Sequence, residues 1–298
     1  MQDYLVRATA GDGQIRALAA VTTQLVEAGR RRHDTLPTAT AALGRTITAA
    51  LLMGATLKGE DTLTMRIFGD GPLGGIIAQS DAHGHVRGYV QEPHTHLPSN
   101  AQGKLDVSGA VGSGHLYVTK DIGLKEPYTG SVPLVSGEIA EDIAHYYAAS
   151  EQIPTVICLG VLVDTDGKVL ASGGYIIQIM PGAGEEVFQA VEDYLKEVVP
   201  VSALIERGQN PEDILKGVLK GFEVNVLEKK DVSFDCHCAK EKLEKVLISL
   251  GEQELQDIIQ QQGKAELKCH FCSEQYEFSG EELEKLLSEA KQGTIQSK

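Results

Sequence analysis

The stretch Asp235-Cys-His-Cys-Ala239, taken together with Cys269-His-Phe-Cys-Ser273, decides how the C-terminal part of this chain folds. It places four of the five cysteines in two close pairs, C-x-C and C-x-x-C, with thirty residues between the pairs. Two turns that each supply two thiolates can hold one zinc ion in a tetrahedron of sulfur ligands. We therefore predict one zinc ion, bound by Cys236, Cys238, Cys269 and Cys272.

The residues next to these cysteines add two further expectations. His237 and His270 lie inside the pairs and can each replace a sulfur, but four thiolates already complete the ligand set, so both are expected to be turn residues. A helix over about 239–250 begins directly after Cys238, and its free N–H groups and dipole favour a thiolate there. Lys240 and Lys242 are candidates to favour it in the same way.

The pattern around the cysteine pairs predicts a small unit over residues 232–298. A second helix is expected over 252–262, and strands over 264–268 and 275–278 flank the second pair. Ser279-Gly-Glu-Glu282 is a capping box that opens a last helix. An apolar core of this size is marginal by itself, so we expect the unit to depend on its metal for folding.

Spacing alone leaves two roles open for this site. A permanently reduced structural zinc module is the role that spacing favours. A redox switch is the alternative, because oxidation of either pair to a disulfide removes zinc ligands. The C-x-C ring is tight, and strain would make its disulfide easier to reduce.

Residues 180–231 predict a helical connector that begins at the break Pro181-Gly-Ala-Gly184. A helix over 185–199 carries an apolar stripe, and a second helix begins at Asn210-Pro211, where a cap residue precedes proline. The first stripe comprises Val187, Val191, Tyr194, Leu195 and Val198, and the second comprises Ile214, Leu215, Val218, Leu219 and Phe222. Both stripes need a covering surface in the folded protein.

Residues 1–179 predict one mixed domain. Helices are expected over 22–31, 38–57 and 138–149. Strands are expected over 3–10, 14–20, 62–68, 74–79, 86–91, 115–120, 155–163 and 168–180. Several strands follow one another directly through turn sequences such as Gly11-Asp-Gly13, which is typical of antiparallel pairing. The fold class is therefore α+β with largely antiparallel sheets, followed by the helical connector and the small zinc unit.

Composition excludes some classes of function. The 298-residue chain has a net charge of −15, and the three parts 1–179, 180–231 and 232–298 each contribute about a third of it. No part has the basic surface of a nucleic-acid binder, and the glycine-rich turns lack the strand and helix context of a nucleotide site. No signal peptide and no membrane-spanning run are evident, and clustered cysteines fit a reducing compartment, so a soluble cytoplasmic protein is expected.

Beyond spacing, the residues themselves resemble a known family. The four-cysteine signature, the stretch Thr119–Tyr128 with Gly130-Ser-Val132, Ser150–Thr155, and Gly173-Gly-Tyr175 closing on Gln178–Gly182 are similar to the bacterial redox-regulated heat-shock chaperones of 33 kDa. The resemblance implies a homodimeric, ATP-independent holdase of the cytoplasm, which is not an enzyme. It also implies that the reduced, zinc-bound form is inactive. Oxidation to two disulfides then releases zinc and activates binding of unfolding proteins.

Under that resemblance, the connector stripes become candidates for client binding. We expect Val187, Val191, Leu195, Leu215 and Leu219 to contact unfolding proteins once the connector loosens, since exposed apolar patches bind apolar segments. Ordinary core packing is the alternative for these residues. Two other functions stay in competition with the holdase: a zinc-ribbon nucleic-acid adaptor, and a metabolic enzyme with a structural zinc tail.

Overall fold

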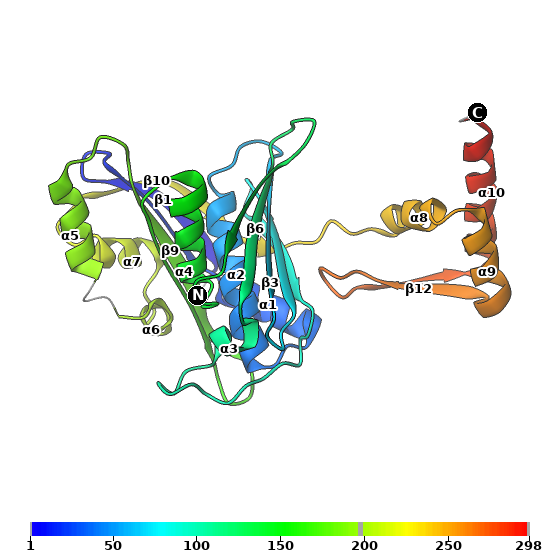
Figure 1. The fold of residues 1–298 in the computed structure, drawn as a ribbon, viewed down its shortest axis with the longest axis horizontal. Coiled ribbons are helices and arrows are strands. Elements are labelled where there is room, and N and C mark those ends of the chain that lie inside the picture. Colours follow the sequence, from blue (N-terminus) through cyan, green and yellow to red (C-terminus); the bar gives the residue numbers. More distant parts are fainter. Residues whose placement is uncertain (1, 196–198, 297–298) are drawn as a thin grey trace. The chain divides into compact units, whose positions relative to one another are not determined.

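The computed structural model describes residues 2–195 and 199–296, with side chains for all of these except 195 and 290–296. The chain forms two compact units, Met1–Asp235 and Cys236–Lys298. The predicted α+β class with largely antiparallel sheets is confirmed. Figure 1 labels the helices and several strands of the two units.

The first sheet has five strands, all paired antiparallel, in the order β10 (Val224–Asp231), β1 (Tyr4–Ala10), β2 (Ile15–Val21), β9 (Val169–Ile179) and β8 (Thr155–Val163). The β1–β2 hairpin turns at Gly11, Asp12 and Gly13, which all have positive φ. Glycine accepts this backbone region without a steric penalty, so the predicted turn forms where the sequence places it.

The second sheet has six strands in the order β11 (Ser233–Phe234), β5 (His85–Val90), β4 (Gly75–Asp81), β3 (Thr62–Gly69), β6 (Gly114–Asp121) and β7 (Tyr128–Pro133). Its neighbours pair antiparallel, except that β11 runs parallel to β5.

The main core lies around two helices, α1 (Thr23–His33) and α2 (Pro37–Gly54). Helix α2 is buried along almost its whole length, because it contacts β8 and β9 of the first sheet and β4 and β5 of the second. Short helices α3 (Val107–Val111) and α4 (Ala140–Tyr146) add to this core, and a π-helical turn at Tyr147–Glu151 follows α4.

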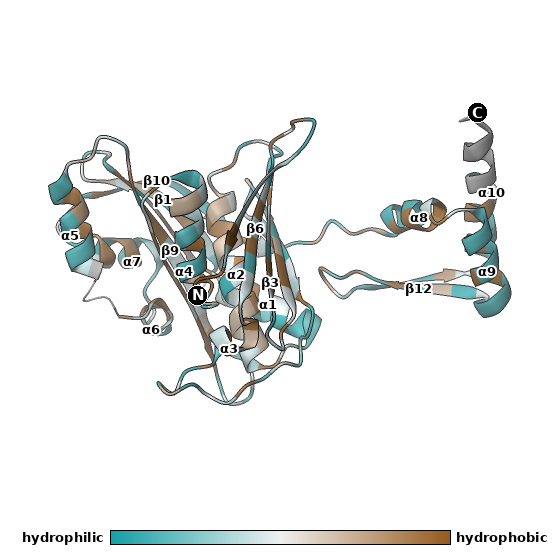
Figure 2. Cartoon of the chain, viewed as in Figure 1, coloured by the Kyte–Doolittle hydropathy of each residue, from teal (hydrophilic) through white to brown (hydrophobic). Residues whose placement is uncertain are grey.

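Residues 180–231 contain three helices, α5 (Glu185–Leu195), α6 (Val201–Glu206) and α7 (Pro211–Val218). They cover the face of the first sheet opposite to α2, as Figure 1 shows. Apolar residues lie along β9 and on the sheet-facing side of α5 in Figure 2. The predicted cap is confirmed, because the Asn210 side chain accepts a hydrogen bond from the Asp213 N–H at 2.9 Å.

Strand β10 is a departure from the expected all-helical connector. It pairs with β1 along seven positions, with one irregularity between Arg7 and Ala8. All of its side chains are exposed or half-buried, and Val224 is its one residue in contact with the apolar core of the connector helices. Backbone hydrogen bonding to β1 holds it in place, and that partner lies more than two hundred residues earlier in the sequence.

The C-terminal unit contains α8 (Lys240–Ser249), α9 (Glu252–Gln262), β12 (Lys264–Lys268), β13 (Gln275–Ser279) and α10 (Gly280–Gln296). Strands β12 and β13 form an antiparallel hairpin. The predicted capping box is present: the Ser279 N–H donates to Glu282 Oε2 at 2.8 Å, and the Glu282 N–H donates to Ser279 Oγ at 3.4 Å. The small core is formed by Leu247, Leu255, Ala265, Phe278, Leu283 and Leu286.

Among the described residues, no helix has both the length and the apolar character needed to cross a bilayer.

Candidate metal centre

The four predicted ligands come from two short segments of the C-terminal unit. Cys236 and Cys238 lie in the extended segment that leads into α8, whose N-cap is Ala239. Cys269 and Cys272 lie in the turn between β12 and β13. The hairpin register, in which Lys268 faces Gln275, closes that turn and brings its two thiols together.

The four sulfurs form one cluster. All four Sγ atoms lie within 4.8 Å of one another. Cys236 Sγ is 3.7 Å from Cys269 Sγ, and Cys238 Sγ is 3.2 Å from Cys272 Sγ. Four sulfurs at about 2.3 Å from a single tetrahedral ion lie about 3.8 Å apart, so the cluster has room for one metal ion. None of these four described cysteines forms a disulfide, Cys272 is buried, and the other three are half-buried.

The second pair sits in a tight backbone turn. The Cys269 N–H donates to the Glu274 carbonyl at 2.9 Å, and the Ser273 N–H donates to the Cys269 carbonyl at 2.8 Å. Ser273 has a φ of 59°, in the left-handed region that favours glycine. This turn therefore aims both thiols toward the same point at the cost of some backbone strain.

The two lysines near the first pair bind other groups. Lys240 Nζ lies 2.6 Å from Glu282 Oε1 and over the Phe278 ring, and Lys242 Nζ donates to the His237 carbonyl at 2.7 Å. Lys240 thus ties α8 to α10, and Lys242 braces the C-x-C segment through its backbone. The structure therefore gives both lysines bracing roles next to the first cysteine pair.

Sequence reasoning missed Tyr276 on β13. Its hydroxyl donates to Cys238 Sγ at 3.2 Å, and this hydrogen bond raises the pKa of the Tyr276 phenol. Tyr276 and the core residue Phe278 are two residues apart on one strand, so their side chains share a face. That alternation, four residues after Cys272, is the sequence signal that could have identified Tyr276.

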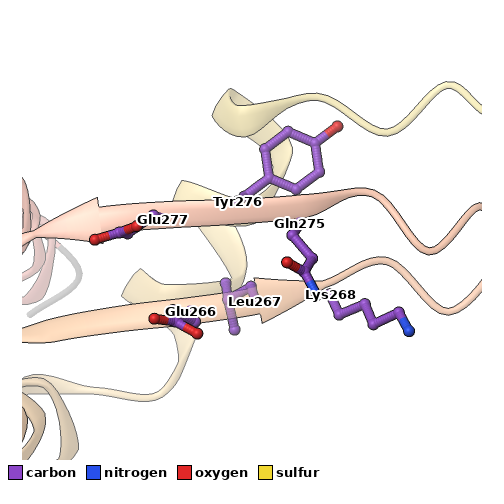
Figure 3. Close-up of a pocket in the computed structure, with 6 residues that line it drawn as sticks. All are labelled: Glu266, Leu267, Lys268, Gln275, Tyr276 and Glu277. Atoms are coloured by element: carbon purple, nitrogen blue, oxygen red, sulfur yellow. The ribbon is translucent and has the colours of Figure 1, made fainter.

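Figure 3 shows the hairpin around Tyr276. Glu266, Leu267, Lys268, Gln275, Tyr276 and Glu277 line an open groove of about 460 Å³. Its walls are mostly charged or polar, and Lys264 is paired with both Glu266 and Glu277. Without an apolar wall or converging polar groups, the groove has no features of a ligand site.

Four neighbouring thiolates would repel one another, so the cluster can hold all four negative charges only if a bound cation neutralises them. Burial raises the pKa of the Cys269 and Cys272 thiols, because desolvation disfavours a thiolate. A bound metal ion reverses this preference and deprotonates coordinating thiols. The fifth cysteine, Cys158, lies on β8 outside the cluster, and burial raises its pKa as well.

The candidate client-binding residues lie in the first unit, whereas the sulfur cluster belongs to the second unit. Val187, Val191, Leu215 and Leu219 are 6%, 2%, 0% and 0% exposed, in a core shared with β1, β2 and β9. Val187 and Val191 come from α5, whereas Leu215 and Leu219 come from α7 and its C-cap. The side chain of Leu195 and all of Val198 lie outside the described residues. The stripes are thus covered by the first sheet of their own unit.

Comparisons with known proteins agree over nearly the whole chain. The family model described as Hsp33 protein matches residues 3–279. Proteins named 33 kDa chaperonin are similar: that of Desulforamulus reducens is 58% identical (96% of this chain, 98% of the relative), and that of Bacillus subtilis strain 168 is 52% identical (95% and 98%). The solved structure of the 33 kDa chaperonin (heat shock protein 33 homolog) of Thermotoga maritima aligns with a TM-score of 0.91 at 39% identity, over 97% of this chain and 98% of that one.

Proposed function

This chain belongs to the Hsp33 protein family, and from that premise we propose that it is a redox-regulated molecular chaperone of the holdase type. In the proposed cycle, the reduced protein holds one zinc ion through Cys236, Cys238, Cys269 and Cys272 and is inactive. Oxidation of the four thiols to two disulfides releases zinc and activates binding of unfolding proteins. We further propose that it works in the cytoplasm as a homodimer, without nucleotide, nucleic acid or membrane.

The sulfur cluster is the observation that carries this proposal. Four thiols within 4.8 Å of one another match the donor set and spacing that zinc prefers. Zinc, when bound, keeps the sulfurs as thiolates, and in small zinc-dependent peptides its binding supplies about 10–16 kcal/mol of folding free energy. The core of the C-terminal unit is small, so we expect that unit to unfold when the thiolates are lost.

Each disulfide forms with one molecule of peroxide as the two-electron oxidant, so the two disulfides consume two molecules of peroxide. One thiolate attacks the peroxide and becomes a sulfenic acid as the O–O bond breaks and hydroxide leaves. A second thiolate then attacks the sulfenic sulfur, forms the S–S bond and displaces a second hydroxide. We propose closure within each pair, Cys236 with Cys238 and Cys269 with Cys272, because the two cysteines of each pair are close in the sequence. In the structure, the short Sγ–Sγ distances of 3.7 and 3.2 Å instead lie between the two segments, from Cys236 to Cys269 and from Cys238 to Cys272. Peptide mapping of the disulfides therefore tests the pairing directly.

The connector stripes supply the proposed client surface. Val187, Val191, Leu215 and Leu219 are covered by the first sheet in the folded protein, so they contact clients only after α5 and α7 detach. Detachment also uncovers the apolar face of β1, β2 and β9. Leu195 belongs to this proposed surface by its place on α5.

One experiment tests the proposed function. Zinc-loaded protein is treated with peroxide at heat-shock temperature, and zinc release, loss of free thiols and suppression of client aggregation are followed together. We expect the three to rise together, and a Cys158→Ser variant to behave as wild type because Cys158 lies outside the cluster. Complete zinc release with no gain in aggregation suppression would refute the holdase.

A second experiment tests the client surface separately. Val191→Glu places a charge on the α5 stripe, and Glu192→Gln on the exposed side of α5 is the matched control. We expect oxidised Val191→Glu protein to suppress aggregation several-fold less well than the control, at equal zinc release. Wild-type efficiency would remove α5 from the client surface and leave the redox switch intact.

A further inference from the structure

The residues just before the first cysteine form an added strand on the second sheet. Ser233 and Phe234 pair with His85 and Val86 in β11, the only parallel pairing among the described strands. The Ser233 N–H donates to the Gly84 carbonyl at 3.1 Å, and the Asp235 N–H donates to the Val86 carbonyl at 3.0 Å. Residues 232–235, here called the strap, therefore cover an edge of β5.

The strap also places apolar side chains into the first unit. Val232 and Phe234 are partly buried and pack against the main core. The Phe234 ring lies over α1 at Gly29, where a Cβ would stand 3.3 Å from the ring. The Arg32 guanidinium sits over the same ring at 5.1 Å from its centroid. The edge of β5 and this face of α1 together form a site that accepts an aromatic side chain on an extended backbone.

The strap forms few contacts and lies directly before the first cysteine of the sulfur cluster. It forms a strand of only two residues, and an element with few contacts opens more easily than the core around it. Cys236, a member of the sulfur cluster, follows Asp235 directly. When the C-terminal unit unfolds, the strap becomes the last ordered element before a loose chain, and such ends fray.

An edge strand without its partner is a template for another extended chain. The carbonyls of Gly84 and Val86 are then unpaired, and main-chain hydrogen bonding of this kind accepts many sequences. The strap itself shows which segments fit, because its apolar residues Val232 and Phe234 alternate with the polar residues Ser233 and Asp235. An unfolding protein exposes many such alternating segments from its own strands.

We propose that the edge of β5, with the Gly29–Arg32 face of α1, binds an extended apolar segment of an unfolding protein, and that the strap occupies this site in the reduced form. This proposal rests on the holdase function above and adds a second client surface to it, on a different sheet from the α5 and α7 stripes. A tethered strap is present at high effective concentration, so it excludes clients until it frays.

The test is photo-crosslinking in the full-length chain. A benzophenone amino acid replaces Arg32, whose side chain is exposed beside the Phe234 ring, and a matched probe replaces Tyr128, which is 51% exposed on β7. In the reduced protein, we expect the probe at position 32 to crosslink within its own chain. In the oxidised protein with heat-unfolded citrate synthase, we expect it to crosslink the client at several times the yield of the probe at position 128.

The outcomes separate this proposal from the proposed function. Oxidised protein that suppresses aggregation but crosslinks the client no better at 32 than at 128 overturns the β5 site and leaves the holdase standing. Crosslinks from position 32 to a second copy of this chain overturn the client as the occupant. Oxidised protein that suppresses no aggregation counts against the holdase itself.

Two variants of the strap supply an independent measurement. Ser233→Pro removes the N–H that donates to Gly84, and Ser233→Ala keeps it. We expect reduced, zinc-loaded Ser233→Pro protein to crosslink the client at position 32 several-fold more than Ser233→Ala protein. If hydrogen exchange shows the strap open in Ser233→Pro and client crosslinking stays at the Ser233→Ala yield, the β5 site is excluded. If hydrogen exchange shows the strap still closed in Ser233→Pro, this variant does not open the site. The β5 site is then accepted or excluded by the client crosslinks of the oxidised protein, compared between positions 32 and 128.

Discussion

The hydroxyl of Tyr276 lies 3.2 Å from the Sγ of Cys238, so a side chain on β13 is joined to the cysteine pair that precedes α8. The hydrogen bond links the two segments that supply the four sulfurs. Groups that donate to a metal ligand orient it and tune its affinity for the ion.

The first prediction concerns this hydrogen bond. Tyr276→Phe keeps the ring against the small core and removes only the donor. Removal of such an outer partner costs about 10-fold in metal affinity, so we expect zinc to pass to a chelator about 10-fold more readily. Chelator competition followed by absorbance measures it, and Tyr128→Phe on the exposed strand β7 is the control. Equal zinc retention in both variants would show that the hydrogen bond does not stabilise the site.

The second prediction concerns the strained turn after Cys272. Ser273 has a φ of 59°, and glycine adopts this conformation without the clash between Cβ and the backbone. We expect Ser273→Gly to stabilise the zinc-loaded C-terminal unit by about 0.5–1 kcal/mol, after the extra backbone entropy of the unfolded glycine is counted. Thermal unfolding measures the change. Ser249→Gly, in the last turn of α8, should shift stability in the opposite direction.

The third prediction concerns a buried carboxylate that organises the segment before α4. Asp142 is fully buried, and its Oδ1 accepts from the N–H groups of Val135 and Ser136 at 2.7 and 3.0 Å, while its Oδ2 accepts from Ile139 at 2.9 Å. Asp142→Ala leaves these N–H donors without an acceptor. Each donor that stays buried away from water lowers the free energy of unfolding by about 1–3 kcal/mol. We expect a total loss of about 3 kcal/mol in urea unfolding of the first unit, against almost none for the exposed Glu141→Ala.

The fourth prediction concerns pH. Burial raises the pKa of Asp3 from 3.8 to about 6, and its Oδ1 has no hydrogen-bond partner. The hydrogen bond that its Oδ2 accepts from the Leu25 N–H at 2.7 Å lowers the pKa and offsets only part of this effect. The folded state binds this proton more tightly than the unfolded state. The stability from Asp3 is therefore fully present below pH 4 and is lost as pH rises through about 6.

Asp3→Asn removes this titration. We expect the variant to be more stable than wild type at pH 7.5, by about 2–3 kcal/mol at most, and the difference to shrink as pH falls toward 4. Urea unfolding at several pH values measures it, and the difference between variant and wild type isolates Asp3 from the other carboxyl groups. A constant difference across this range would mean that the Asp3 carboxyl does not titrate there.

Some features of this fold follow from short stretches of sequence. Asn210-Pro211 and Ser279–Glu282 mark helix starts correctly, because a cap residue and the N–H groups that it binds lie within three positions of each other. Gly11-Asp-Gly13 marks a hairpin for a similar reason, since positive φ is a local demand. The largely apolar runs on either side of that turn identify β1 and β2 as strands.

Other features were not accessible in this way. β10 has no buried side chain, so no apolar pattern marks it, and its place depends on the backbone of β1. β7 was missed for the same reason, because four of its six residues are exposed. No sequence pattern predicts that Lys240 binds Glu282 and the Phe278 ring, because this contact exists only where α8 and α10 pack together.

The sequence by itself determined which atoms can hold a metal, because four clustered cysteines have few other uses in a chain with only five. It also determined that α5 and α7 carry apolar stripes, since helical periodicity is a property of one segment. The sequence also predicts a short strand over 231–235. Only the tertiary structure decided what covers the stripes, which hydroxyl binds Cys238, and that this short strand pairs with β5 of the second sheet. Each of these depends on pairing between segments far apart in the chain, and a strand edge accepts many sequences through its backbone, so no local pattern can specify the partner.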